Sequence, residues 1–123
     1  MLSLTNPRLP GLKPVEAEAL ADTGAVFLCI PESVRCELQL EIEELKEVTL
    51  ANGSKCMAPY VGPIKVRFKN RTAYVGAVVV GDTVLLGAIP MEDMDLVVLP
   101  KDRRVDVNPA SPDVARAFAK RAA

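Results

Sequence analysis

The longest apolar runs in this chain are about as long as one β-strand, and turn-forming residues separate them. A membrane-spanning helix needs about 20 consecutive apolar residues, so we expect no membrane segment. Half of the 123 residues are hydrophobic, which favours a folded core over disorder. The pattern predicts one mainly β domain over residues 1–123, with roughly seven or eight short strands and two or three short helices.

Charge and cysteine content narrow the class of protein further. The net charge of −1 gives no electrostatic reason to expect a nucleic-acid partner. The N-terminus lacks a basic stretch followed by an apolar one, so no signal peptide is visible and we expect a cytoplasmic protein. The three cysteines, Cys29, Cys36 and Cys56, have no CxxC spacing. We expect reduced, mostly buried thiols and neither a metal nor another cofactor.

The chain contains no histidine. This excludes a Ser-His-Asp triad, a Cys-His pair, an HExxH zinc site and a histidine general base. The sequence also has no GxGxxG stretch and no Walker loop. Hydrolytic chemistry would therefore have to use carboxylates, a lysine, or an unassisted serine, threonine or cysteine.

Alternation, apolar runs and turn residues predict the secondary structure along the chain. The expected strands are 15–19, 26–30, 48–50, a return arm from Lys55, 64–68, 72–80, 84–89, 96–99 and 104–107. A helix should begin at Pro31, with Val34 and Leu38 on one face. A short helix is expected at 90–94, and Ser111-Pro112-Asp113 predicts the start of a helical tail within about 108–123.

Two segments between these elements have particular roles. Residues 32–47 carry six acids and two bases, which predicts a solvated acidic face. The dipeptide Asn52-Gly53 predicts a β-hairpin with a type I′ turn. Because Pro59, Gly62 and Pro63 interrupt its return arm, this arm should be an edge strand or a mobile strand.

Asp22 lies on a tight turn between two apolar runs. Aspartate is rarely buried without a partner, so the side chain needs a function or a local contact. A water-activating carboxylate is one interpretation, and a turn residue that caps its own backbone is the other. We interpret Asp82 as a second turn residue, and expect Asp93 and Asp95 on an exposed helix.

The run Asp22-Thr23-Gly24-Ala25 is followed by the hairpin Val48–Gly62 and then by Leu85-Leu86-Gly87-Ala88 and an expected helix. In order and spacing these segments resemble the retropepsin-like (clan AA) aspartic proteases, most closely the small prokaryotic single-domain type. The resemblance implies a small closed β-barrel of the pepsin/retropepsin kind, with a flap hairpin and short helices. Met1–Leu4 is shorter than the first strand of the retroviral relatives.

Hydrolysis by carboxylates needs one ionised group to take a proton from water and one protonated group to polarise the carbonyl. Two aspartates roughly 3 Å apart can share one proton in this way. One chain offers a single such residue, so the catalytic Asp22 should meet its copy on the two-fold axis of a homodimer. Gly24 and Gly87 would allow close backbone approach around it. The resemblance assigns the Thr23 hydroxyl to bracing the dimer, and places Ala25 and Leu86 in the supporting loops.

The flap tip would comprise Ala51, Asn52 and Gly53. Candidate walls of the substrate pocket, for each of which ordinary core is the alternative, are Ala25, Val48, Leu50, Met57 and Ile89. The expected function is that of an aspartic endopeptidase whose partners are a second copy of itself and an extended peptide or protein substrate. The alternatives are a non-catalytic dimeric β module that binds a peptide or partner protein, and a structural subunit of a larger complex.

Overall fold

The computed structural model describes residues 1–18 and 20–118 and is mainly β. Its strands are β1 (Leu2–Thr5), β2 (Val15–Ala17), β3 (Leu20–Ala21), β4 (Leu28–Ile30), β5 (Ile42–Thr49), β6 (Lys55–Phe68), β7 (Arg71–Val79), β8 (Leu85–Leu86), β9 (Leu96–Leu99) and β10 (Arg104–Val107). The helices are α1 (Glu32–Glu37) and α2 (Ala88–Asp93). The predicted strands at 96–99 and 104–107 are confirmed. Of the predicted strand 15–19, residues 15–17 form β2, and residue 19 lies outside the described residues.

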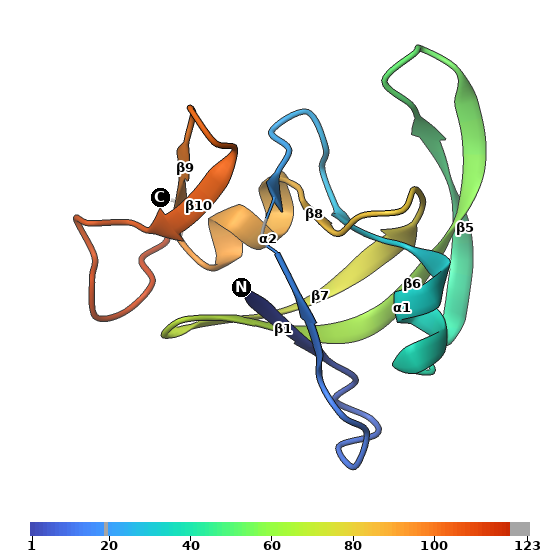
Figure 1. Cartoon of the computed structure of the whole chain (residues 1–123), viewed down its shortest axis with the longest axis horizontal. Helices are drawn as coiled ribbons and strands as arrows, with labels where there is room; N and C mark the ends of the chain where they lie inside the picture. The colour runs from blue at the N-terminus through green and yellow to red at the C-terminus, as the bar shows by residue number, and fades with distance from the viewer. Residues whose placement is uncertain (19, 119–123) are drawn as a thin grey trace, which may run out of the picture.

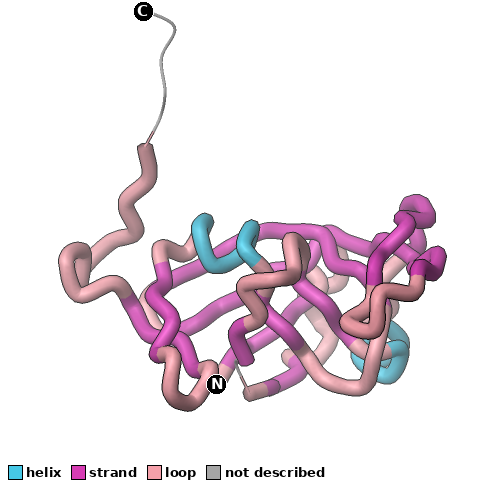
Figure 2. The backbone as a smooth tube through the Cα atoms, turned by 90° about the horizontal axis from the view of Figure 1, so that it is seen from above, coloured by secondary structure: helices cyan, strands magenta, loops and turns pink. Residues whose placement is uncertain are grey.

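Eight of the strands form one curled sheet in the order β2-β1-β6-β7-β4-β8-β3, with β5 paired to β6 beside this path. Strands β9 and β10 form a separate hairpin (Figure 1). The ends of the path, β2 and β3, are neighbours along the chain, which accounts for the strong curl seen in Figure 2. The expected closed barrel is not found among the described residues, because β2 pairs only with β1 and β3 only with β8.

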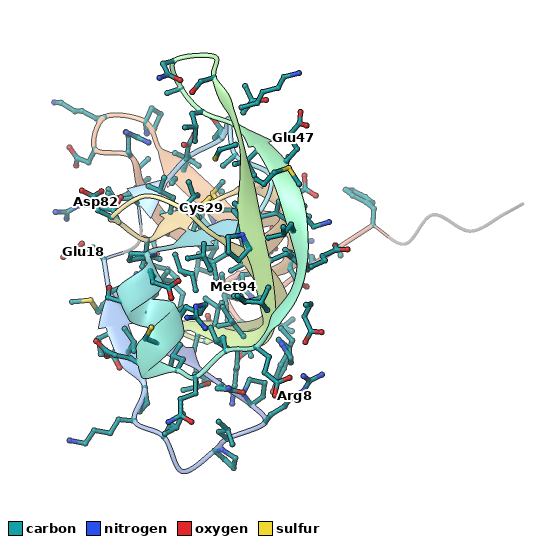
Figure 3. All side chains as sticks on the ribbon, turned by 90° about the vertical axis from the view of Figure 1, so that its right-hand side faces the viewer. Arg8, Glu18, Cys29, Glu47, Asp82 and Met94 are labelled. Atoms are coloured by element: carbon teal, nitrogen blue, oxygen red, sulfur yellow. The ribbon has the colours of Figure 1, made fainter. Side chains whose placement is uncertain are left out.

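The main core fills the inside of this curl. Alternate residues of the long strands point inward, as the pleat requires, among them Val66 of β6 and Ala73 of β7. Helix α2 closes the core with Met91 and Met94, and Met94 is fully buried near the centre of the molecule (Figure 3). The helix predicted at Pro31 forms as α1 and contributes Val34 to the core, with Leu38 at its C-cap.

Strands β5 and β6 form the predicted hairpin, which rises from the body as a two-stranded ribbon (Figure 1). The predicted type I′ turn is wrong, because within the tip only Gly53 has positive φ, at 85°. Asn52 instead accepts a hydrogen bond from the Ser54 amide at its Oδ1, 2.9 Å away. The amide of Leu50 donates to the Ser54 carbonyl at 2.8 Å and closes the ladder below the tip. The acidic side chains of 32–47 are exposed on α1 and β5, as predicted.

The prediction that the return arm is an edge strand holds for residues 55–59, which pair with β5 alone, and is wrong from Tyr60 onward. Strand β6 lies inside the sheet, with β7 on one side from Tyr60 onward and β5 and then β1 on the other. Pro59 falls in the part of β6 that pairs with β5 alone, so the missing N–H of this proline removes no hydrogen bond to a second neighbouring strand. Pro63 falls where the β6–β7 register shifts. The two prolines are therefore accommodated without interrupting the sheet.

Helix α2 begins at Ala88, two residues before the predicted start at Pro90. The strand predicted over 84–89 is correspondingly cut to Leu85–Leu86. The amides of Ala88 and Ile89, which begin the helix, donate to the carbonyls of Ala25 and Val26 at 2.8 and 2.9 Å. These bonds also explain why the strand predicted over 26–30 starts only at Leu28.

The predicted helical tail is wrong for residues 111–118, which have no helical structure, while residues 119–123 lie outside the described residues. The Ser111 hydroxyl donates to the Asp95 carboxylate instead of capping a helix, and the Arg116 amide donates to the same carboxylate at 3.0 Å. Arg71, only 1 % exposed, donates to the Ser111 carbonyl. Tertiary contacts with Arg71 and Asp95 thus replace local helix formation.

The expectation that Asp95 lies on an exposed helix is wrong. Asp95 follows α2 and adopts the left-handed region, with φ of 52°. Hydrogen bonds from Ser111, Asn108 and the Arg116 amide lower the pKa of its carboxyl to about 2. Asp82 lies in an exposed turn, as predicted. Neither helix in the described part of the chain is long and apolar enough to cross a membrane.

Candidate active site

The loop of residues 22–27 joins β3 to β4 across the end of β8, which pairs with both strands. Strand β3 runs parallel to β8, with Ala21 opposite Leu86, whereas β4 runs antiparallel to it. The chain must therefore reverse over β8 between the two strands, above α2 in Figure 1. The Asp22 amide donates to the Leu86 carbonyl at 2.9 Å, and the Ala25 amide to the Asp22 carbonyl at 3.0 Å. These bonds fix the turn that carries the Asp22 side chain.

The Asp22 carboxylate accepts a hydrogen bond from the Gly24 amide at 3.0 Å, through Oδ1. A Cβ on Gly24 would lie 3.3 Å from that oxygen, so glycine gives the carboxylate room. Asp22 itself is half-buried, and Thr23 and Gly24 are exposed. The carboxylate is thus oriented by its own loop and open on the side of Thr23, which fits both the catalytic and the turn-capping interpretation.

Gly87 lies directly beneath this loop. A Cβ at this position would lie 2.3 Å from the Phe27 carbonyl oxygen and 2.8 Å from that of Ala25. Its φ of −85° is open to any residue, so space and not conformation requires glycine here. The expected support of the Asp22 loop by Leu86 and Gly87 is therefore present in the geometry.

A second support comes from the turn between β9 and β10, which the sequence did not predict as part of the site. The Ala21 amide donates to the Arg103 carbonyl at 2.8 Å, and Arg103 Nε donates back to the Ala21 carbonyl at 3.3 Å. Arg103 adopts positive φ, 55°, to make this contact. Nothing in the local sequence signals a partner this far along the chain.

A small apolar cluster lies on the outer face of the sheet, between the Asp22 loop and the hairpin. It is built from buried Cys29, Ala58 and Val78, and its partly buried members are Ala25, Phe27, Val48, Tyr60, Val80 and Leu85. We call these nine residues the outer cluster. Burial raises the pKa of the Cys29 thiol, and the charge of nearby Asp22 raises it further. Since Ala25 and Phe27 belong both to the outer cluster and to the Asp22 loop, the cluster adjoins the loop that carries the carboxylate.

The base of the hairpin is held to the Asp22 loop by aromatic contacts. The rings of Phe27 and Tyr60 meet edge to face, with centroids 5.5 Å apart. The Lys46 ammonium lies 4.7 Å from the Tyr60 centroid and 5.3 Å from that of Phe27. The sequence does not single out Phe27, Tyr60 or Cys29, because each lies in an apolar or alternating run that is typical of ordinary core.

The structure brings together some of the predicted pocket residues and separates others. Ala25 and Val48 belong to the outer cluster. Leu50 and Met57 lie on the projecting hairpin, where they are 37 and 58 % exposed, and Ala51, Asn52 and Gly53 form its exposed tip. Ile89, 44 % exposed, lies on α2 beside Val26. The predicted site thus divides into a supported aspartate, an apolar cluster and an uncovered hairpin tip.

Of the three cysteines, only Cys29 is buried; Cys36 is exposed and Cys56 is half-buried, so the expectation of mostly buried thiols is wrong. Within residues 1–18 and 20–118, no three His, Cys, Asp or Glu side chains gather in a way that could hold a metal ion. No model of a known protein family matches the chain, and no curated protein sequence matches it.

We expect the hairpin tip to open locally while its base stays fixed. Residues 49–58 have one neighbouring strand at most, whereas within 73–80 strand β7 pairs with β6 and, at residues 77–79, also with β4. Amide hydrogens of 49–58 should exchange roughly a hundredfold or more faster than those of 73–80. Exchange at equal rates, measured by NMR or mass spectrometry, would mean that the hairpin is not a mobile flap.

Proposed function

We propose that this protein is an aspartic endopeptidase that acts as a homodimer, in which two Asp22 carboxylates activate one water. The observation that carries the proposal is the Asp22 loop itself. The Gly24 amide orients the Asp22 carboxylate, and backbone hydrogen bonds to Leu86 and Arg103 hold the chain at residues 21 and 22. The carboxylate is open to solvent and lies next to the apolar outer cluster. A surface aspartate that only capped its own turn would not need bracing from two distant segments.

The chemistry requires a second carboxylate close to the first. Two carboxylates at about 3 Å cannot both ionise, so they share a proton. The ionised member takes a proton from water, and the protonated member donates to the carbonyl oxygen of the scissile peptide. No metal or cofactor is part of this proposal, and the cytoplasm is its proposed location.

Exposed apolar residues next to the loop suit a two-fold contact. Val26 and Ile89 are 54 and 44 % exposed and are joined by a backbone hydrogen bond. Val26 shares its loop with the exposed Thr23, whose hydroxyl would face its symmetry mate. An interface centred on this patch would bring the two copies of Asp22 toward one axis.

The hairpin and the outer cluster would hold the substrate. An extended peptide lying over the cluster would meet apolar side chains from both the Asp22 loop and the hairpin, and backbone groups of the hairpin could pair with it as with an added strand. Such binding favours unfolded protein segments, which can adopt the extended form, over folded proteins.

The test combines light scattering with a cleavage assay on a reduced, alkylated protein at mildly acidic pH. The expected results are a particle of twice the chain mass and defined peptide products. A stable monomer at high micromolar concentration would contradict the shared-aspartate mechanism. A dimer that binds the unfolded protein without cleaving it would favour the non-catalytic β module.

A further inference from the structure

A second concave surface lies on the outside of β6 and β7, where their register shifts. This hollow has a volume of about 300 Å³, and both tyrosines of the chain line it together with Glu43. Gly62, Pro63 and Gly76 also line it. We call it the tyrosine hollow. None of its residues belongs to the Asp22 loop.

Glycine at position 76 gives the hollow its shape. A Cβ there would lie 2.1 Å from the Tyr60 hydroxyl oxygen, so the Tyr60 ring occupies the space of a side chain on β7. Gly62 makes a similar close approach, since its Cβ would lie 3.1 Å from the Gly76 Cα. Tyr74, two residues before Gly76 on the same face of β7, is 61 % exposed. Two aromatic side chains therefore border a floor of bare backbone.

The charged residue that lines the tyrosine hollow is Glu43, and Lys65 lies opposite Tyr74 on the neighbouring strand. Glu43 lies at its rim, and residues 41–47 carry four glutamates against one lysine. A guanidinium already approaches this carboxylate, since Arg8 Nη1 lies 3.4 Å from Glu43 Oε1 across an exposed contact. The Tyr60 ring already has one cation over it, Lys46 at 4.7 Å. Aromatic faces beside a carboxylate attract organic cations.

We propose that the tyrosine hollow binds the cationic side chain, lysine or arginine, of an extended peptide. Tyr60 belongs both to the hollow and to the outer cluster, so the two surfaces are continuous on one face of the sheet. A peptide lying over the outer cluster would extend into the hollow. The peptide part of this proposal rests on the proposed function, whereas the preference for a cation rests on Glu43 and the two tyrosines alone.

The chain provides its own reporter for this binding. It has two tyrosines and no tryptophan, and both tyrosines line the hollow, so its tyrosine emission reports on the hollow and, through Tyr60, on the adjoining outer cluster. The titration uses Asp22→Asn protein, which keeps peptides intact whether or not the chain is a protease. The probes are an acetylated, amidated pentapeptide with a central lysine, the same peptide with norleucine, and n-butylammonium, which is the lysine side chain alone.

We expect the lysine peptide to bind with a change in tyrosine emission, and the norleucine peptide to bind roughly fivefold or more weakly. Glu43→Gln should remove most of this difference. Glu47→Gln is the matched control, because Glu47 lies on the same strand, pairs with Lys55 at 3.7 Å and sits toward the hairpin tip (Figure 3). Arg8→Ala should tighten binding, because it removes a competing cation from Glu43.

Equal binding of the lysine and norleucine peptides, or equal effects of Glu43→Gln and Glu47→Gln, would overturn the proposal. Binding of n-butylammonium as tight as that of the lysine peptide would overturn its peptide part and assign the hollow to small organic cations. The titration measures binding and not cleavage, so it gives a result even if the wild-type protein cleaves nothing. Failure of the protease proposal and failure of the cation-binding proposal are therefore distinguishable.

Discussion

Replacing Asp22 by asparagine is expected to lower the rate of peptide cleavage by at least about 100-fold, because the amide cannot take the proton from water. The proposed dimer should stay intact, since asparagine keeps the shape of the side chain and can still accept the hydrogen bond from the Gly24 amide. Asp82→Asn is the matched control: Asp82 also follows an apolar run and precedes a threonine, but it lies in an exposed turn. Cleavage that persists undiminished in purified Asp22→Asn protein would reject Asp22 as the water-activating group.

Mixing the two proteins tests whether the site is shared between chains. If subunits exchange freely at equal amounts, roughly a quarter of the dimers keep two Asp22 side chains, and the activity per wild-type chain should fall to about half. The measurement is the initial rate of cleavage after exchange has been verified with tagged chains. An unchanged rate per wild-type chain would mean that each chain acts alone.

Gly87→Ala is expected to be the most destabilising single-methyl change in the chain, lowering the free energy of unfolding by about 3 kcal/mol or more. The added Cβ would meet three backbone atoms of residues 25–27 at less than 3 Å, and backbone within a braced loop cannot move aside cheaply. Any folded protein that remains should carry a displaced Asp22 loop and cleave poorly.

Gly11→Ala is the control for this experiment. Gly11 is exposed and a Cβ there would meet nothing within 4 Å, so the change should stay within about 0.5 kcal/mol. Urea unfolding of both variants gives the comparison. If Gly87→Ala proved as stable as Gly11→Ala, the close packing of the loop over Gly87 would not exist in solution.

The sequence predicted those parts of the fold whose signals are local. Strands 96–99 and 104–107, the hairpin around Gly53 and the helix after Pro31 are all marked by alternation or by turn residues, and all form. Part of the candidate site was predictable, because a tight turn favours Asp22 and Gly24 and a close backbone approach requires Gly87. The contribution of Arg103 was not, because its contact joins residues 82 positions apart.

The errors arise where distant contacts decide local structure. Ser111 and Pro112 favour a helix start when read alone, but the buried Arg71 and the Asp95 carboxylate draw this segment into an irregular path. Pro59 and Pro63 suggest an edge, which holds at Pro59, opposite β5 alone, whereas Pro63 lies at a register shift between paired strands. Neither outcome can be read from a window of neighbouring residues.

The contact between Ala21 and Arg103 has a consequence for how the protein is made. Residues 20–25 are synthesised well before the partners that hold them in β8 and in the turn after β9. A chain that is still being translated therefore cannot assemble the Asp22 loop, and topologies with such long-range pairings fold slowly. If the protein is a protease, as proposed, it should be inactive until the turn after β9 has been synthesised, which would protect the nascent polypeptides around it.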